Sequence, residues 1–182
     1  THRYFTPEEP RALRALATRR EVDAQEAREK VQSLLPELEG LLGRAQHRPA
    51  VHYFEGSAGI KTLLQDVLEH TAQSKEKRYR VYSSMQVRDL IAASWPSLNQ
   101  ARKRRKVSTR AIAIGEGGST YGMDERKWLS KEAGAPTYIF IYGNRTAYVA
   151  ADTKKQLFGV TIEDAGITQS QRLIFDALWS AL

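Results

Sequence analysis

The stretch Val51-His-Tyr-Phe-Glu-Gly-Ser-Ala-Gly-Ile-Lys-Thr-Leu-Leu-Gln-Asp-Val-Leu68 decides the fold of this chain. Its first four residues are typical of a short buried strand, and its apolar residues from Ile60 onward recur at helical spacing. Gly56 and Gly59 flank the turn between them, where glycine lets the backbone approach a ligand closely. The pattern predicts a strand, a tight turn and a helix, the unit with which an open α/β sheet forms a crevice at its strand ends. The alternative is that the glycines only make the turn.

Strands and helices alternate after this unit. Residues 79–84 and 109–115 read as strands, and the segment between them reads as two helical pieces divided by Pro96, one over about 86–94 and one reaching about residue 106. This spacing predicts βαβ units and a mainly parallel sheet. Residues 116–119 are expected to form a loop.

The last third of the chain changes to a different pattern. Residues 137–142, 146–151 and 157–162 read as three strands in an antiparallel meander, the first two joined at Gly143-Asn144. A final helix is expected to be capped by Thr168 and to dock onto the sheet. Its expected apolar face comprises Leu173, Ile174, Ala177, Leu178 and Leu182, widened by Phe175 and Trp179. The alternating aromatic residues Tyr138, Phe140, Tyr142 and Tyr148 are interpreted as strand faces rather than as a base-stacking platform.

The amino-terminal segment predicts a long helix with a heptad seam. The helix is expected to start at Thr6-Pro7-Glu8-Glu9, and Pro36 is expected to kink or restart it near Leu35. The seam positions alternate steps of four and three: Leu13, Ala17, Arg20, Ala24, Ala27, Val31, Leu34, Leu38 and Leu41. At about 1.5 Å per residue the seam spans roughly 43 Å, longer than a small domain needs. We therefore expect a partner helix in a homodimer, and the alternative is a helix folded back along its own domain.

Composition restricts the possible classes. The 182 residues are 41% hydrophobic and include no cysteine, which excludes disulfides and thiol chemistry. No apolar run is long enough for a membrane span and no secretory leader is visible, so a soluble, cytoplasmic protein without membrane contact is expected. The net charge of +7 favours polyanion partners or simply solubility.

An ordered set of segments makes the chain similar to a known family. The segments are Leu35-Pro36-Glu37-Leu38, Pro49–Gly56, Gly59-Ile60, Tyr82-Ser83-Ser84, Ile141–Arg145, Gly159–Asp164, Ile167, Gln171-Arg172, Ile174-Phe175 and Leu178-Trp179. Together they resemble TrmB-type transcription regulators over roughly residues 4–182. The resemblance implies a homodimerising coiled-coil helix followed by a phospholipase-D-like α/β effector domain. It also implies DNA binding through a winged helix expected upstream of Thr1, and the further sugar-binding domain of some members is not carried over.

The catalytic motif of phospholipase-D-type enzymes is absent. That motif is His-x-Lys-x-x-x-x-Asp, in which histidine is the nucleophile and lysine holds the phosphate charge. Tyr4, Pro49, Phe54 and Ala72 stand two positions after the four histidines, so none is followed by the lysine. We therefore expect a non-catalytic protein with no cofactor and no metal, whose crevice binds a small anionic or polar effector.

Position along the chain suggests which residues line that crevice. The candidates stand at the ends of the first three predicted strands: Glu55, Gly56, Ser57, Ser83, Ser84, Gly115 and Glu116. Each serine could equally be a helix cap or a turn former.

The basic run Arg102-Lys103-Arg104-Arg105-Lys106 is a weak candidate for nucleic-acid binding. Five consecutive cations on a helix cannot all face one groove, and the last turn of a helix favours positive charge, so a solvated helix end is the simpler interpretation.

These observations predict an α/β fold: a long N-terminal coiled-coil helix in residues 1–46, then a mixed-sheet phospholipase-D-like domain in residues 47–182. The expected function is the dimerisation and effector part of a DNA-binding transcription regulator. Two alternatives stay open, a phosphodiesterase or nuclease with an unrecognised site and a nucleic-acid-binding module that uses residues 102–106.

Overall fold

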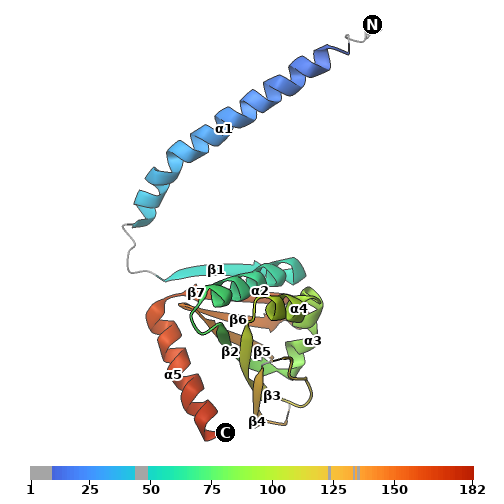
Figure 1. Cartoon of the computed structure of the whole chain (residues 1–182), viewed down its shortest axis with the longest axis vertical. Helices are drawn as coiled ribbons and strands as arrows, with labels where there is room; N and C mark the ends of the chain where they lie inside the picture. The colour runs from blue at the N-terminus through green and yellow to red at the C-terminus, as the bar shows by residue number, and fades with distance from the viewer. Residues whose placement is uncertain (1–9, 44–48, 123, 133, 135) are drawn as a thin grey trace. The chain divides into compact units, whose positions relative to one another are not determined.

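The chain divides into two units in this computed structural model, Thr1–Arg48 and Pro49–Leu182. The structure describes residues 10–43, 49–122, 124–132, 134 and 136–182. In the first unit these residues form α1 (Ala12–Gly43). In the second they form β1 (Ala50–Glu55), α2 (Gly56–Gln73), β2 (Arg78–Ser84), α3 (Met85–Ser94), α4 (Leu98–Arg104), β3 (Ser108–Ile114), β4 (Glu125–Ser130), β5 (Thr137–Tyr142), β6 (Arg145–Ala151), β7 (Leu157–Glu163) and α5 (Ala165–Ala181) (Figure 1).

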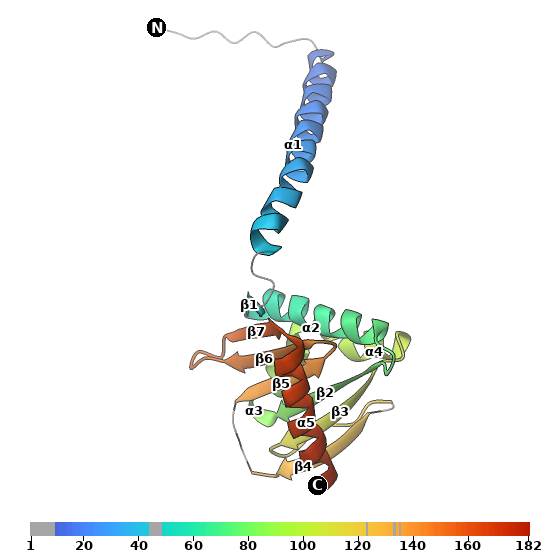
Figure 2. The same ribbon diagram turned by 90° about the vertical axis from the view of Figure 1, so that its left-hand side faces the viewer.

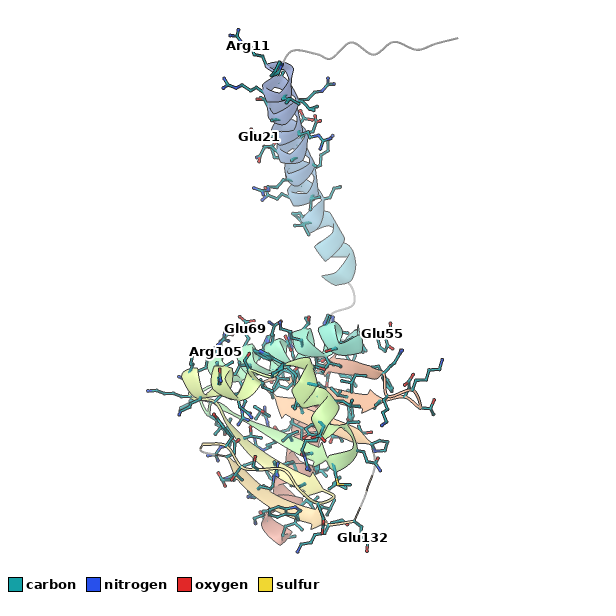
Figure 3. All side chains as sticks on the ribbon, turned by 90° about the vertical axis from the view of Figure 1, so that its right-hand side faces the viewer. Arg11, Glu21, Glu55, Glu69, Arg105 and Glu132 are labelled. Atoms are coloured by element: carbon teal, nitrogen blue, oxygen red, sulfur yellow. The ribbon has the colours of Figure 1, made fainter. Side chains whose placement is uncertain are left out.

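Helix α1 is continuous over 32 residues and includes Pro36 in its interior. The expectation of a restart near Leu35 was therefore wrong, because one missing backbone bond does not end a helix whose other turns are intact. The alternative expectation, a kink there, stays a prediction. The predicted start at residues 6–9 and the side chains of Leu38 and Leu41 lie outside the described residues. Side chains project from all sides of α1 (Figure 3), and Leu13, Val31 and Leu34 are 68%, 59% and 51% exposed. Pairing with a second helix stays a prediction.

The strands of the second unit form one mixed sheet in the order β1-β7-β6-β5-β2-β3-β4. In the described part of the chain, only β2–β3 and β3–β4 pair in parallel, and the other four pairs are antiparallel. The expectation of a mainly parallel sheet was wrong because β5 and β7 run opposite to the rest. The β5-β6-β7 meander is confirmed, as is the βαβ unit from β2 through α3 and α4 to β3.

Strand β4 was not predicted from the sequence. It begins Glu125-Arg-Lys and carries Trp128, and its side chains are exposed or half-buried. A short, charged edge strand has neither the clean alternation nor the β-branched composition that marks a strand in sequence. Its addition makes β3 an interior strand of the sheet, and Ile112 and Ala113 on β3 are fully buried.

Helices cover both faces of the sheet. α2, α3 and α4 lie on one face, while α5 crosses the other (Figure 2). Strand residues alternate between the two layers: Val81 and Phe140 pack in the cluster under α2 and α3, whereas Tyr82 and Ile141 pack with Phe175 of α5. Of the four aromatic residues interpreted as strand faces, Tyr138, Phe140 and Tyr142 are buried and Tyr148 is half-buried.

Helix α5 begins earlier than the sequence suggested and docks through only part of the predicted face. Asp164 is the N-cap, with its carboxylate accepting from the Ile167 amide at 2.7 Å, and Thr168 is buried inside the helix. Phe175 is 0% exposed, with Leu178 and Trp179 packed beside it, while Ile174 is 56% exposed. The predicted docking face was therefore wrong for Leu173, Ile174, Ala177 and Leu182, all of which are exposed.

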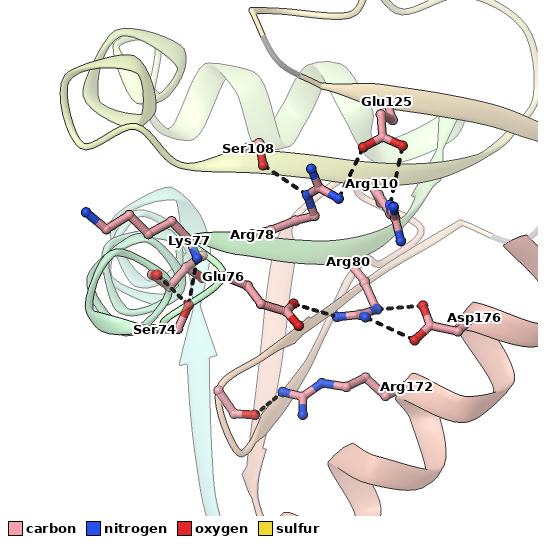
Figure 4. Close-up of polar contacts among 12 residues, drawn as sticks. Ser74, Glu76, Lys77, Arg78, Arg80, Ser108, Arg110, Glu125, Arg172 and Asp176 are labelled. Carbon is pink, nitrogen blue, oxygen red and sulfur yellow. Dashed lines mark hydrogen bonds and ion pairs between the residues drawn. The ribbon is translucent and has the colours of Figure 1, made fainter.

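A bidentate ion pair also holds α5 to the sheet. Arg80 of β2 donates from Nε and Nη2 to the two carboxylate oxygens of Asp176 at 2.7 and 3.0 Å (Figure 4). Further along the helix, Lys127 donates to the carbonyl of Trp179 at 2.7 Å, where the carbonyls of the last turn favour a cation. No described helix combines the length and the apolar composition that crossing a membrane requires.

Candidate functional site: a cavity beside β2 and β3

The strand order separates the residues expected to line one crevice. Glu55, at the end of β1, lies at the outer edge of the sheet, and three strands stand between β1 and β2. With neighbouring strands about 4.8 Å apart, the ends of β1 and β2 are roughly 19 Å apart. Glu55 and Ser57 are exposed at the start of α2, whose other end carries Glu69 (Figure 3). Glu55, Gly56 and Ser57 therefore do not join the other candidates.

The other candidates, on β2 and after β3, are close together, but their structural roles differ. Ser83 lines a cavity, and its hydroxyl is 2.6 Å from the hydroxyl of Tyr138. Ser84 is the N-cap of α3, accepting from the Gln86 amide, so for this residue the helix-cap alternative is the better description. Gly115 has φ +85°, and a Cβ there would lie 2.7 Å from that of Met85, so both the backbone conformation and the space favour glycine. Glu116 contributes its carbonyl, not its carboxylate.

The cavity has a volume of about 350 Å³, at the lower end of the range for small-molecule sites. Its floor is the sheet, with Val81 and Ser83 from β2 and Phe140 from β5. Ile91 and Trp95 give it an apolar wall on the α3 side. The loop after β3 and the arginines described below supply the polar part of the lining. The lining is therefore partly apolar and partly polar.

Arg102 and Asp124 form a fixed part of the polar lining. Arg102 Nη2 donates to Asp124 Oδ1, and the Thr109 amide donates to the same oxygen at 2.9 Å. The Arg102 side chain is only 9% exposed, and its guanidinium lies 5.5 Å from the centre of the Tyr79 ring. Burial raises the pKa of the Tyr79 phenol, which therefore stays neutral. The pair is a structural brace between α4 and the segment that leads into β4.

Two further arginines from different elements line the cavity and contact the loop after β3. Arg88 stands in the first turn of α3 and donates from Nη1 to the Glu116 carbonyl at 3.0 Å. Arg126 stands on β4 and donates from Nη1 to the Gly117 carbonyl at 3.1 Å. Burial, and then repulsion from Arg88, lower the pKa of Arg126 below its ordinary value. The site thus places two like charges side by side.

The described histidines lie away from this cavity. His52 is on the exposed edge strand β1, and His70 on α2 is beside Asp66, Tyr142 and Arg145. Neither lines the cavity. Within the described part of the chain, no group of three or more His, Asp or Glu side chains is arranged to hold a metal ion. Among the described residues, no imidazole lines the cavity with the hydroxyls of Ser83 and Tyr138 to act as a base.

The structure divides the basic run. Arg102 is buried and paired as described, so it is not available to a nucleic-acid phosphate. Lys103, Arg104, Arg105 and Lys106 are exposed at the end of α4. Arg104 and Arg105 border a hollow that they share with Glu69 of α2. Nucleic-acid binding by the four exposed cations stays an untested prediction.

Sequence reasoning missed Arg88, Arg126 and Asp124. The one local signal was the glycine-rich stretch from Gly115 to Gly118, which was predicted as a loop but not connected to any cation. Arg126 could not be placed because β4 was not predicted, and Arg88 looked like an ordinary helix arginine.

The second unit thus belongs to the three-layer α/β class with a mixed sheet. Comparisons with known proteins add little to this fold class. No family model matches this chain, and no curated protein matches it either. Similar solved structures include TrmBL2, an archaeal chromatin protein, with a TM-score of 0.45 and 15% identity over 96% of this chain and 71% of that one. NucT from Helicobacter pylori has a TM-score of 0.49 and 9% identity over 73% of this chain and 97% of that one. Nuc from Salmonella typhimurium, a phospholipase D family member, has a TM-score of 0.45 and 16% identity over 73% and 95%.

Proposed function

We propose that this chain is the dimerisation and effector-sensing part of a TrmB-like, DNA-binding transcription regulator, with a non-catalytic α/β unit. The ordered sequence resemblance supports the family. The exposed seam of α1 supports dimerisation, and it is the observation that carries the proposal. Over 32 residues the helix is about 48 Å long and presents Leu13, Val31 and Leu34 to solvent. Burying such a stripe against a second copy is the usual way to stabilise a long isolated helix.

The cavity beside β2 and β3 is the proposed effector site. Its described lining includes no histidine, which supports binding without turnover. A dimer of α1 helices would set the spacing of two DNA-reading heads, and a ligand that favours one conformation of the α/β unit would shift that arrangement.

The test is the oligomeric state of the full chain by light scattering. We expect a dimer that the substitution Val31→Asp converts to a monomer, because a carboxylate in a heptad seam is strongly unfavourable. Val22→Asp is the matched control: Val22 is on the same helix and is 51% exposed, but it is not in the seam. A wild-type monomer at high concentration, or equal loss of dimer in both variants, would refute the proposal.

A further inference from the structure

Arg88 and Arg126 make no ion pair with a carboxylate of the described residues, although arginines at partly buried positions normally have such a partner. Three of their nitrogens are buried without any hydrogen-bond partner, namely Arg88 Nε, Arg88 Nη2 and Arg126 Nε. Unsatisfied buried donors on a charged group are costly, so they call for an explanation.

The neighbouring carboxylates cannot supply the missing charge in this arrangement. Asp124 is occupied by Arg102 and the Thr109 amide. Glu125 side-chain oxygens lie 3.2 Å from Arg78 and 3.4 Å from Arg110. Asp89 lines the cavity but is exposed, and it makes no ion pair with a described residue.

The glycine loop holds the two guanidinium groups close together. A Cβ built on Gly118, which has φ +79°, would lie 3.0 Å from both Arg88 Cζ and Arg126 Nη2. Both groups therefore converge on one point that only glycine leaves free. Arg88 donates one N–H to the Glu116 carbonyl, and Arg126 donates one N–H to the Gly117 carbonyl. These bonds fix the two side chains, while most of their other N–H groups make no hydrogen bond to a described residue. Two adjacent, positioned guanidinium groups are the usual arrangement for binding a phosphate through paired hydrogen bonds.

We propose that Arg88 and Arg126 bind the phosphate of a small organic phosphate whose apolar body occupies the cavity between Trp95 and the sheet. The inference rests on the proposed function, because it names the ligand class of the proposed effector site. A phosphate dianion matches the two unpaired positive charges, and the cavity of about 350 Å³ admits a body of the size of a single ring. Ser83 and Tyr138 on the floor are within the same cavity and add hydroxyl groups to it.

The test is calorimetric titration of the full chain with phenyl phosphate and, separately, with inorganic phosphate. We expect both phosphates to bind saturably. Phenyl phosphate should bind more tightly, because its ring contacts the apolar side chains that line the cavity. Arg88→Met and Arg126→Met should each weaken binding at least about tenfold. Arg104→Met is the matched control, since Arg104 is exposed outside the cavity, and it should bind like the wild type.

Thermal melting in phosphate-free buffer separates lost binding from lost folding. Because removing one of two repelling, unpaired cations relieves a cost, both methionine variants should melt at or above the wild-type temperature. Arg88→Lys and Arg126→Lys keep the charge as a second pair of variants, and they should still weaken phenyl phosphate several-fold by losing the paired donors. The inference would be overturned if phenyl phosphate did not bind the wild type saturably. It would also be overturned if the Arg88 and Arg126 variants bound it as the wild type does, or if Arg104→Met weakened binding equally.

Failure of this inference can be told apart from failure of the proposed function. A monomeric chain that binds phenyl phosphate through both arginines would remove the regulator proposal and leave the phosphate site. A dimer that does not bind phenyl phosphate would remove the phosphate site and leave the regulator proposal.

Discussion

Asp124 organises one wall of the cavity through a single carboxylate. Its side chain is 12% exposed, accepts from Arg102 and from the Thr109 amide, and thereby joins α4, β3 and the segment before β4. A buried charge pair of this kind adds little net stability compared with an apolar pair, but breaking it strands the remaining charge.

Asp124→Ala should therefore destabilise the protein by about 3 kcal/mol, because Arg102 loses its carboxylate partner and keeps only the bond to Asn99, while the Thr109 amide loses its acceptor. Urea unfolding followed by circular dichroism measures the change. Asp89→Ala is the control, since Asp89 lines the same cavity but is exposed and makes no ion pair with a described residue, and it should change stability by less than about 0.5 kcal/mol. Equal midpoints for the two variants would contradict this account of the wall.

Single residues were predictable from sequence where their partners are local. Ser84 as a helix cap needs only Gln86, two positions away, so local reasoning offered the correct alternative. The Arg88 contact spans 28 positions and the Arg102–Asp124 pair spans 22, and both depend on which strands are neighbours. No local pattern contains that information, which is why the polar part of the cavity lining was not foreseen.

Among the elements, α5 shows where periodicity is informative and where it is not. The sequence indicates a helix with many apolar residues, but these cover most of its circumference, so the pattern does not select the docking side. The structure selects Phe175, which lies 5.1 Å from Tyr82 between ring centres in an edge arrangement.

Phe175→Ala should cost about 3 to 5 kcal/mol by leaving a cavity under α5, whereas Ile174→Ala should cost less than about 1 kcal/mol. The two residues are adjacent and both apolar, but Phe175 is 0% and Ile174 is 56% exposed. Denaturant unfolding of the two variants compares them directly. A larger loss for Ile174→Ala would restore the docking face predicted from sequence.

Element boundaries were largely predictable, but the strand order was not. The strands expected at 79–84, 109–115, 137–142, 146–151 and 157–162 each fall within one or two residues of β2, β3, β5, β6 and β7. The pairing of β1 with β7 joins segments about one hundred positions apart and is decided by the whole sheet. That pairing moves β1 to the edge and removes Glu55 from the predicted crevice.

At the scale of the whole molecule, the two units have separate means of stabilisation. Every residue of both buried clusters lies between residues 54 and 179, within the second unit. We therefore expect a chain of residues 49–182 to unfold cooperatively at the same midpoint as the full chain and to keep phenyl phosphate binding, but to be a monomer. Calorimetric melting and light scattering of the truncated chain measure both properties. A lowered midpoint would show that the α/β unit needs α1 to fold.

The path of α2 has a consequence for communication between distant parts of the α/β unit. This helix starts at Gly56 directly after β1, runs past β7 and β5, and ends in contact with α3, which bears Arg88. A signal relayed strand by strand from the proposed phosphate site beside β2 to β1 would have to cross four ladders, each of which could absorb part of the movement. The 18-residue helix α2 moves as one rigid element, so a displacement at one end is passed to the other without crossing any ladder. Sliding of α3 by a fraction of an ångström would thus reach the end of β1 through α2, and Pro49, where the connection to α1 begins, precedes the other end of that strand.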